Sequence, residues 1–375
     1  MSPIIELPND SSISTNRRET ATKIMNQNKL LAVSGKLDTI PAGRVTWVDT
    51  LKFLGIFAIY LGHYGESTAR FYLFVWMYHV ALFFFMSGFF ALKSRDQSIL
   101  SFAYKKFRTI LLPWLLFCLI NVVFQAVQQT SSLGDIKKWI IQVVRGSIRN
   151  QTDIGAALWF LPALFVTSVG FHILLRLTKN KYAAIAVCIV LHVVSVIVMG
   201  MPDNPSWVFN IDSAMYYSVF YALGILIFPF LRTYSFPESS HVKNGAVIAV
   251  GAIGFAYAGF TYLGPQTAQW SFVHSNDGFV FVATVLMLIP NIVLARWLSN
   301  FGLLSKIGQN TLILCGTETL LKTLVPDILG LFGLTATLSD PMSVVLYVGF
   351  LIVLSYFTLI PLLKKAFPSI LQNIG

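Results

Sequence analysis

The sequence is short of charge. Only 11% of its 375 residues are Asp, Glu, Lys or Arg, whereas 55% are hydrophobic. Soluble domains carry about a quarter charged residues, so this chain lacks the polar side chains that a water-exposed surface needs. The composition therefore excludes an ordinary soluble protein and predicts an all-α polytopic membrane protein.

Cysteine is also scarce, and its few copies form no recognisable pattern. Cys118, Cys188 and Cys315 each lie within an apolar run. Their spacing fits neither a disulfide framework nor a set of metal ligands, so we expect three small buried side chains and no metal site. A glycine-rich phosphate loop and a repeat of fixed period are absent from the sequence as well.

The net charge of +11 could suggest a nucleic-acid partner. The basic residues, however, are scattered between apolar runs instead of forming one patch. That distribution is typical of membrane-protein loops that obey the positive-inside rule. We therefore expect membrane lipids, and no nucleic acid, around this protein.

The first 44 residues are polar and contain no apolar run of signal-peptide length. We expect residues 1–44 to form a disordered cytoplasmic tail and residues 45–375 to form the membrane domain. A partner-binding role for the tail stays open.

About ten apolar segments follow the tail. A bilayer core of about 30 Å needs roughly 20 apolar residues per helix, and helices satisfy their own backbone groups there. The expected spans are 46–65, 71–92, 109–129, 156–176, 182–200, 213–231, 244–263, 279–298, 310–330 and 342–363. The ninth is the weakest, because it contains Glu318 and Lys322.

Loop charges orient this bundle of about ten helices. The loops at 201–212, 264–278 and 331–341 have no Lys or Arg, whereas the alternate loops and both ends of the chain do. Both termini are therefore expected in the cytoplasm. The loop 130–155 disagrees, since it should be external yet holds four cations. Its stretch IKKWIIQVVRGSI is amphipathic, so we expect a surface helix on the outer face.

The first span, LKFLGIFAIYLGHYG, carries Lys52 and His63. Eleven positions of helix bring these residues to within about 20° of one face, roughly 16 Å apart along the axis. Asp49, one turn before Lys52, falls on the same side. A lysine near the start of a helix can also reach the interface by itself, and this alternative stays open for Lys52.

The second span adds His79 near its middle. An ionisable side chain at that depth is costly and usually faces a cavity. A core histidine that is hydrogen-bonded to a neighbouring helix is the alternative. The pair Ser87-Gly88 in the same span would allow close helix packing.

Several motifs follow one another in a characteristic order. WVDTLKFLGIFAIYLGH is followed by WMYHVALFFFMSGFF, FAYKKFRTILLP, ALWFLPALF, YALG and IGQNTLIL. This set, over about residues 45–365, resembles the acyltransferase-3 family of integral membrane acyltransferases and its sugar O-acetyltransferase branch. Lys52 stands where that family often has arginine. Glu318 stands where many relatives have a histidine, so no role is assigned to it.

The resemblance implies acetyl transfer from acetyl-CoA to a hydroxyl of a cell-envelope polysaccharide or lipid-linked sugar, in the bacterial cytoplasmic membrane. Imidazole is well matched to deprotonate a sugar hydroxyl or to carry acetyl briefly, which makes His63 the candidate. Lys105 and Arg108 match the family's Arg-x-x-Arg element. Together with Lys52 they are expected to bind the phosphates of acetyl-CoA.

Three further residues receive lesser roles. Asp49 is expected to hold Lys52. Glu66 is a candidate to orient the His63 imidazole, although the sequence favours a solvated loop residue at that position. His79 is expected to donate to the thioester carbonyl or to hold the sugar.

Two other classes of protein fit parts of the pattern. A secondary transporter or lipid-linked-sugar flippase also has about ten helices and intramembrane charges, but the two halves of this chain show no repeat symmetry. A membrane scaffold or sensor would not need the register of Lys52 and His63. The sequence leaves the oligomeric state open.

Overall fold

A computed structural model of the protein describes residues 44–64, 70–128, 131–146, 154–199, 207–233, 239–263, 275–335 and 338–372. The chain divides into two units. One comprises Met1–Arg44 and Phe228–Tyr234, and the other comprises Val45–Ile227 and Ser235–Gly375. Within the first unit, residues 228–233 are helical, and the expected tail lies outside the described residues apart from Arg44. The contacts and sites described below lie within the second unit.

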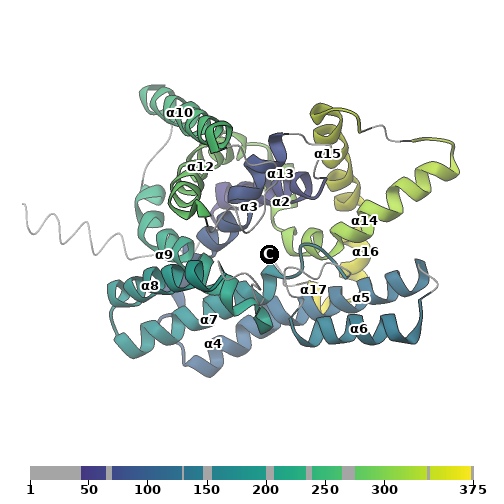
Figure 1. The fold of residues 1–375 in the computed structure, drawn as a ribbon, viewed down its shortest axis with the longest axis horizontal. Helices are drawn as coiled ribbons and strands as arrows, with labels where there is room; N and C mark the ends of the chain where they lie inside the picture. Colours follow the sequence, from purple (N-terminus) through teal and green to yellow (C-terminus); the bar gives the residue numbers. More distant parts are fainter. Residues whose placement is uncertain are drawn as a thin grey trace, which may run out of the picture. The chain divides into compact units, whose positions relative to one another are not determined.

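Every regular element among the described residues is a helix (Figure 1). The α-helices of the first half are α2 (Thr46–Gly62), α3 (Arg70–Gly88), α4 (Ile99–Lys106), α5 (Leu112–Gln128), α6 (Leu133–Val144), α7 (Phe160–Thr178) and α8 (Lys181–Met199). Those of the second half are α9 (Ile211–Thr233), α10 (Ser239–Leu263), α12 (Asp277–Leu298), α13 (Gly302–Gly308), α14 (Thr311–Leu331), α15 (Pro341–Phe357), α16 (Leu359–Ala366) and α17 (Pro368–Leu371). Short 3₁₀ segments (Ala91–Ser94 and Val208–Asn210) and one π-helical segment (Phe107–Leu111) join some of them.

The helical architecture confirms the all-α membrane class. Each of the ten expected spans overlaps a helix of the structure or a continuous run of helices. Within the described residues six stretches are long and apolar enough to cross a bilayer: Ile99–Gln128, Phe160–Thr178, Lys181–Val198, Val208–Arg232, Asp277–Leu298 and Pro341–Ala366. The total of ten spans and the cytoplasmic placement of both termini stay predictions.

Helix α2 is the element around which the site is built. It packs against α3, α12, α13, α14 and α15 (Figure 1). Its inward side chains Leu51, Ile56 and Ile59 are buried, and the Tyr60 hydroxyl donates to the Leu314 carbonyl of α14 at 2.8 Å. A helix surrounded in this way is apolar on nearly every side, because almost every direction faces protein.

Glycines set the closest helix crossings. A Cβ placed on Gly88 of α3 would lie 2.0 Å from the Tyr221 carbonyl oxygen of α9, and one on Gly224 of α9 would lie 2.0 Å from the Phe85 oxygen. Only the absence of a side chain allows these two backbones to touch. The expectation that Gly88 serves helix packing is therefore confirmed.

The amphipathic stretch after α5 forms helix α6, which packs against α5. Ser132 caps it, with its side chain accepting from the Asp135 N–H while Asp135 accepts from the Ser132 N–H. Such a reciprocal box satisfies two backbone donors at the start of a helix. At 12 residues α6 is about 18 Å long, too short to cross a bilayer. Its expected position on the outer face stays a prediction.

Candidate acyl-transfer site at the two ends of helix α2

His63 directly follows the last residue of α2, in the C-cap position. Its Nδ1 lies 3.2 Å from Oε1 of Glu318 on α14, and the Glu318 side chain is only 2% exposed. The two atoms are close, but they do not form an aligned hydrogen bond. A carboxylate beside Nδ1 favours the tautomer that carries its proton there, which leaves Nε2 able to accept a proton. His63 is thus arranged as a base with a buried orienting partner.

Glu318 has further contacts on its own helix. Its Oε2 accepts a hydrogen bond from the Thr319 hydroxyl at 3.2 Å. A buried carboxylate is costly unless it is paired, so the imidazole and the hydroxyl compensate its loss of water. Sequence reasoning assigned Glu318 no role, and the structure places it beside the candidate base.

Lys322, one turn after Glu318, holds the end of α2. Its Nζ donates to the carbonyl oxygen of His63 and lies 4.8 Å from the centroid of the Tyr64 ring. A cation at a helix C-terminus is favoured by the helix dipole and satisfies a carbonyl that has no partner within the helix. The two ionisable residues that weakened the ninth span are therefore the residues that contact His63. A pair of ionisable residues spaced four apart within an otherwise apolar segment was the signal that could have found them.

His79 lies in α3 beside the same end of α2. Its Cε1 would be 3.9 Å from a Cβ on Gly62, the residue before His63. Its Nδ1 donates to the Val75 carbonyl at 2.5 Å, so its bond is to its own helix and not to a neighbouring one. Glu66, the other residue predicted at this end, lies outside the described residues.

The opposite end of α2 carries the expected ion pair. Lys52 Nζ lies 3.2 Å from Oδ1 of Asp49, one turn earlier, and Asp49 is buried. Helix α13 packs tightly there, because a Cβ on Gly308 would lie 1.8 Å from the Asp49 carbonyl oxygen. The pairing of these two residues is thus confirmed, while their role in catalysis stays a prediction.

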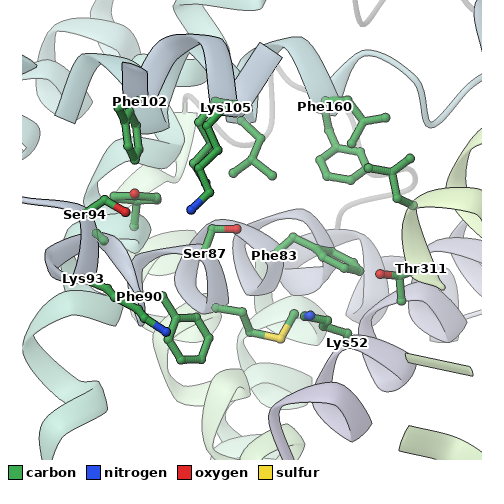
Figure 2. A pocket seen from close by; sticks show the side chains of 17 residues that line it. Lys52, Phe83, Ser87, Phe90, Lys93, Ser94, Phe102, Lys105, Phe160 and Thr311 are labelled. Carbon is green, nitrogen blue, oxygen red and sulfur yellow. The ribbon is translucent and has the colours of Figure 1, made fainter. Parts of the chain in front are cut away.

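A cavity of about 350 Å³ opens beside Lys52. Its walls are mostly apolar, and its polar lining consists of four lysines and of residues with a hydroxyl group, namely Lys52, Lys93, Lys105, Lys106, Ser87, Ser94, Thr311 and Tyr221. Figure 2 shows Lys105 reaching into it from α4 and Lys52 from the α2 side. Four cations around one cavity favour a polyanionic ligand.

The cavity brings together two of the three residues predicted to bind phosphate. Lys52 and Lys105 line it, whereas Arg108, an exposed residue of the π-helical segment, is not among its lining residues. Sequence reasoning missed Lys93 and Lys106 because it read them only as loop charges that set topology. Lys106 also lies 5.5 Å above the ring of Phe102, another lining residue.

One continuous helix connects the two groups. Lys52 lies in the second turn of α2 and His63 just after its end. Eleven residues of helix separate them by about 16 Å along the axis. The arrangement therefore places an anion-binding cavity and a base at opposite ends of one rigid element.

The chain was compared with known proteins. A family model described as an acyltransferase domain matches residues 45–360. No curated protein and no solved structure matches the chain. The matched range begins at the start of α2 and ends within α16, so it includes both ends of α2 and the cavity.

Proposed function

Because the chain belongs to the acyltransferase-3 family of integral membrane acyltransferases, we propose that it is an O-acetyltransferase that uses acetyl-CoA. The proposed acceptor is a hydroxyl of a cell-envelope polysaccharide or of a lipid-linked sugar. The proposed location is the bacterial cytoplasmic membrane.

One structural observation supports the proposal independently of the family match. A histidine paired with a buried carboxylate stands at one end of α2, and a cavity with four lysines opens at the other. Acyl transfer from coenzyme A needs both a base for the hydroxyl and cations for the phosphates of the donor. A transporter would need neither the His63–Glu318 pair nor its separation from Lys52, so the family match and this pair favour acyl transfer over the transporter class.

His63 acts in one of two ways that the geometry supports equally. As a general base, its Nε2 accepts the hydroxyl proton while the hydroxyl oxygen attacks the thioester carbonyl carbon. The C–O bond forms, the C–S bond breaks, and the coenzyme A thiolate takes the proton from the imidazolium. As a carrier, Nε2 attacks the thioester carbonyl first, the C–S bond breaks, and the departing thiolate takes the ring proton. The hydroxyl oxygen then attacks the acetyl-imidazole, the C–N bond breaks, and the hydroxyl proton returns to the ring. Glu318 orients the ring in both routes.

Lys52, Lys93, Lys105 and Lys106 supply the charge that holds the donor. Lysine binds phosphate as a point charge on a flexible stem, so several lysines around a cavity can follow a polyanion without a rigid fork. Asp49 holds one of them, Lys52, in place.

The proposal is tested with purified protein, acetyl-CoA labelled in its acetyl group, and envelope glycan from a host that lacks the gene. Label should move to the glycan in an alkali-labile, ester-linked form, and His63→Ala should abolish the transfer. The control is Lys243→Gln, an exposed residue of α10, which should transfer at the wild-type rate. Absence of transfer by folded wild-type protein, or full transfer by His63→Ala, would contradict the proposal.

A further inference from the structure

Two tyrosine hydroxyls near His63 have no hydrogen-bond partner in the part of the chain that the structure describes. The Oη atoms of Tyr64 and Tyr347 are both buried. The whole Tyr347 residue is only 9% exposed. Buried tyrosine hydroxyls usually find a partner, and the rare exceptions call for a reason such as a missing ligand.

These two side chains touch each other. Their ring centroids are 6.0 Å apart and their planes are nearly perpendicular, at 87°. Tyr64 follows His63 in the chain, and Tyr347 lies on α15, which packs against both α2 and α14. The two unpartnered hydroxyls therefore belong to one cluster beside the candidate base.

Lys322 completes the cluster. Its Nζ lies 4.8 Å from the centroid of the Tyr64 ring and donates to the His63 carbonyl oxygen. The Glu318 carboxylate, one turn away on the same face of α14, interacts electrostatically with this ammonium group and offsets part of its charge. The cluster thus offers two hydroxyls and two aromatic rings, with little positive charge left for an anion.

This chemistry fits a neutral sugar. A pyranose ring presents C–H groups that pack on aromatic faces and hydroxyls that exchange hydrogen bonds with phenolic hydroxyls. A phosphate or sulfate would need cations, which are gathered instead at the cavity near Lys52. Ligand sites typically combine aromatic side chains with a few polar groups.

We propose that Tyr64, Tyr347 and Lys322 form the acceptor subsite, and that this subsite binds an uncharged pyranose ring next to His63. The inference rests on the proposed function, since it names the part of the acyl-transfer site that holds the hydroxyl donor. Tyr64 and Tyr347 bind the sugar, whereas Lys322 positions the end of α2.

The binding test uses purified full-length protein and four methyl α-pyranosides, those of glucose, galactose, mannose and rhamnose. Saturation-transfer NMR should detect at least one of them with wild-type protein. The double variant Tyr64→Phe/Tyr347→Phe keeps both rings and removes both hydroxyls. Loss of two hydrogen bonds should weaken that binding by roughly tenfold or more. The matched control is Tyr182→Phe, an exposed tyrosine of α8, which should bind as wild type does.

Two further readouts separate a binding role from a structural one. Removing a buried hydroxyl that has no partner should leave the unfolding temperature unchanged or raise it, whereas removing a structural hydrogen bond would lower it. With envelope glycan as acceptor, the double variant should raise the KM for glycan severalfold and leave the KM for acetyl-CoA unchanged.

Wild-type pyranoside affinity in the double variant, or no binding of any of the four by wild-type protein, would overturn the subsite. A lowered unfolding temperature with an unchanged KM for glycan would overturn it as well. The proposed function fails by a different result, namely absence of label transfer by wild-type protein, so the two failures are distinguishable.

Discussion

The two ends of α2 use charge in opposite ways. At the Lys52 end, four lysines surround a cavity, and a buried carboxylate, that of Asp49, pairs with one of them. At the His63 end, Glu318 lies beside the imidazole and Lys322 donates to the backbone carbonyl of His63, so both charged side chains contact the protein itself. Charges that face a cavity can bind an anion from outside, whereas charges that pair among themselves fix the geometry of a side chain. Helix α2 thus has an anion-binding cavity at its Lys52 end, called the binding end, and a candidate base at its His63 end, called the chemical end.

Among changes that leave His63 in place, removal of the buried carboxylate has the largest expected effect. Glu318→Gln keeps the shape of the side chain but no longer favours the Nδ1-protonated imidazole. We expect kcat to fall by about 10²-fold, because His63 then loses much of the contribution that a positioned general base makes. The KM for acetyl-CoA should not change, because the cavity is at the other end of α2.

Rapid-mixing measurement of label transfer checks this expectation, with Lys243→Gln as the control. A Glu318→Gln protein that turns over at the wild-type rate would contradict the orienting role of Glu318 at the His63 end of α2.

The next effect concerns the binding end. Lys105→Gln removes one of the cations that line the cavity, and we expect acetyl-CoA to bind about tenfold more weakly, as for a lost charge-assisted contact. Isothermal titration with acetyl-CoA measures it. The comparison variant is Arg108→Gln, because Arg108 is close in sequence but does not line the cavity. If both variants lose the same affinity for acetyl-CoA, the cavity alone does not define the donor site.

Packing distinguishes the two ends as well. Gly308→Ala would force a Cβ to within 1.8 Å of the Asp49 carbonyl oxygen, so α13 must shift away from α2. We expect a loss of about 1–3 kcal/mol, typical of overpacking. Gly62→Ala at the other end meets its nearest side-chain atom, on Val75, at 3.6 Å and should be tolerated. Thermal unfolding in detergent compares the two, and equal stability of both variants would contradict the tight crossing.

The smallest effect is that of salt. Raising ionic strength from 0.1 to 1 M shortens the Debye length from about 10 to 3 Å, which weakens attraction between exposed charges. The KM for acetyl-CoA should rise severalfold, while kcat, set by the buried pair, should stay nearly constant. Steady-state kinetics at both salt concentrations decides this, and a kcat that falls in parallel with binding would show that the ends do not act separately.

Much of the fold follows from the sequence, because apolar runs of bilayer length are a strong signal. Every expected span overlaps a helix, and the separate amphipathic helix α6 was also predicted. The Asp49–Lys52 pair could be predicted because it depends only on the spacing within one helix. Contacts of this local kind are read from periodicity alone.

The site was harder to predict from the sequence than the fold, for a physical reason. The His63–Glu318 contact joins residues 255 positions apart, and no periodicity reports which helices of a bundle are neighbours. Glu318 and Lys322 were noticed only as residues that weakened an expected span, although charge within such an apolar segment is itself a sign of function. Lys93 and Lys106 could not be distinguished from other loop lysines and arginines, because the positive-inside rule explains all of them without a binding role.

The most direct test of the division between the two ends compares His63→Gln with wild type in one preparation. Equilibrium binding of labelled acetyl-CoA and transfer of its acetyl group to envelope glycan are measured on the same sample. We predict that His63→Gln binds acetyl-CoA with the wild-type Kd and transfers no label. Wild-type transfer, or a loss of acetyl-CoA binding that matches the loss of transfer, would contradict the account.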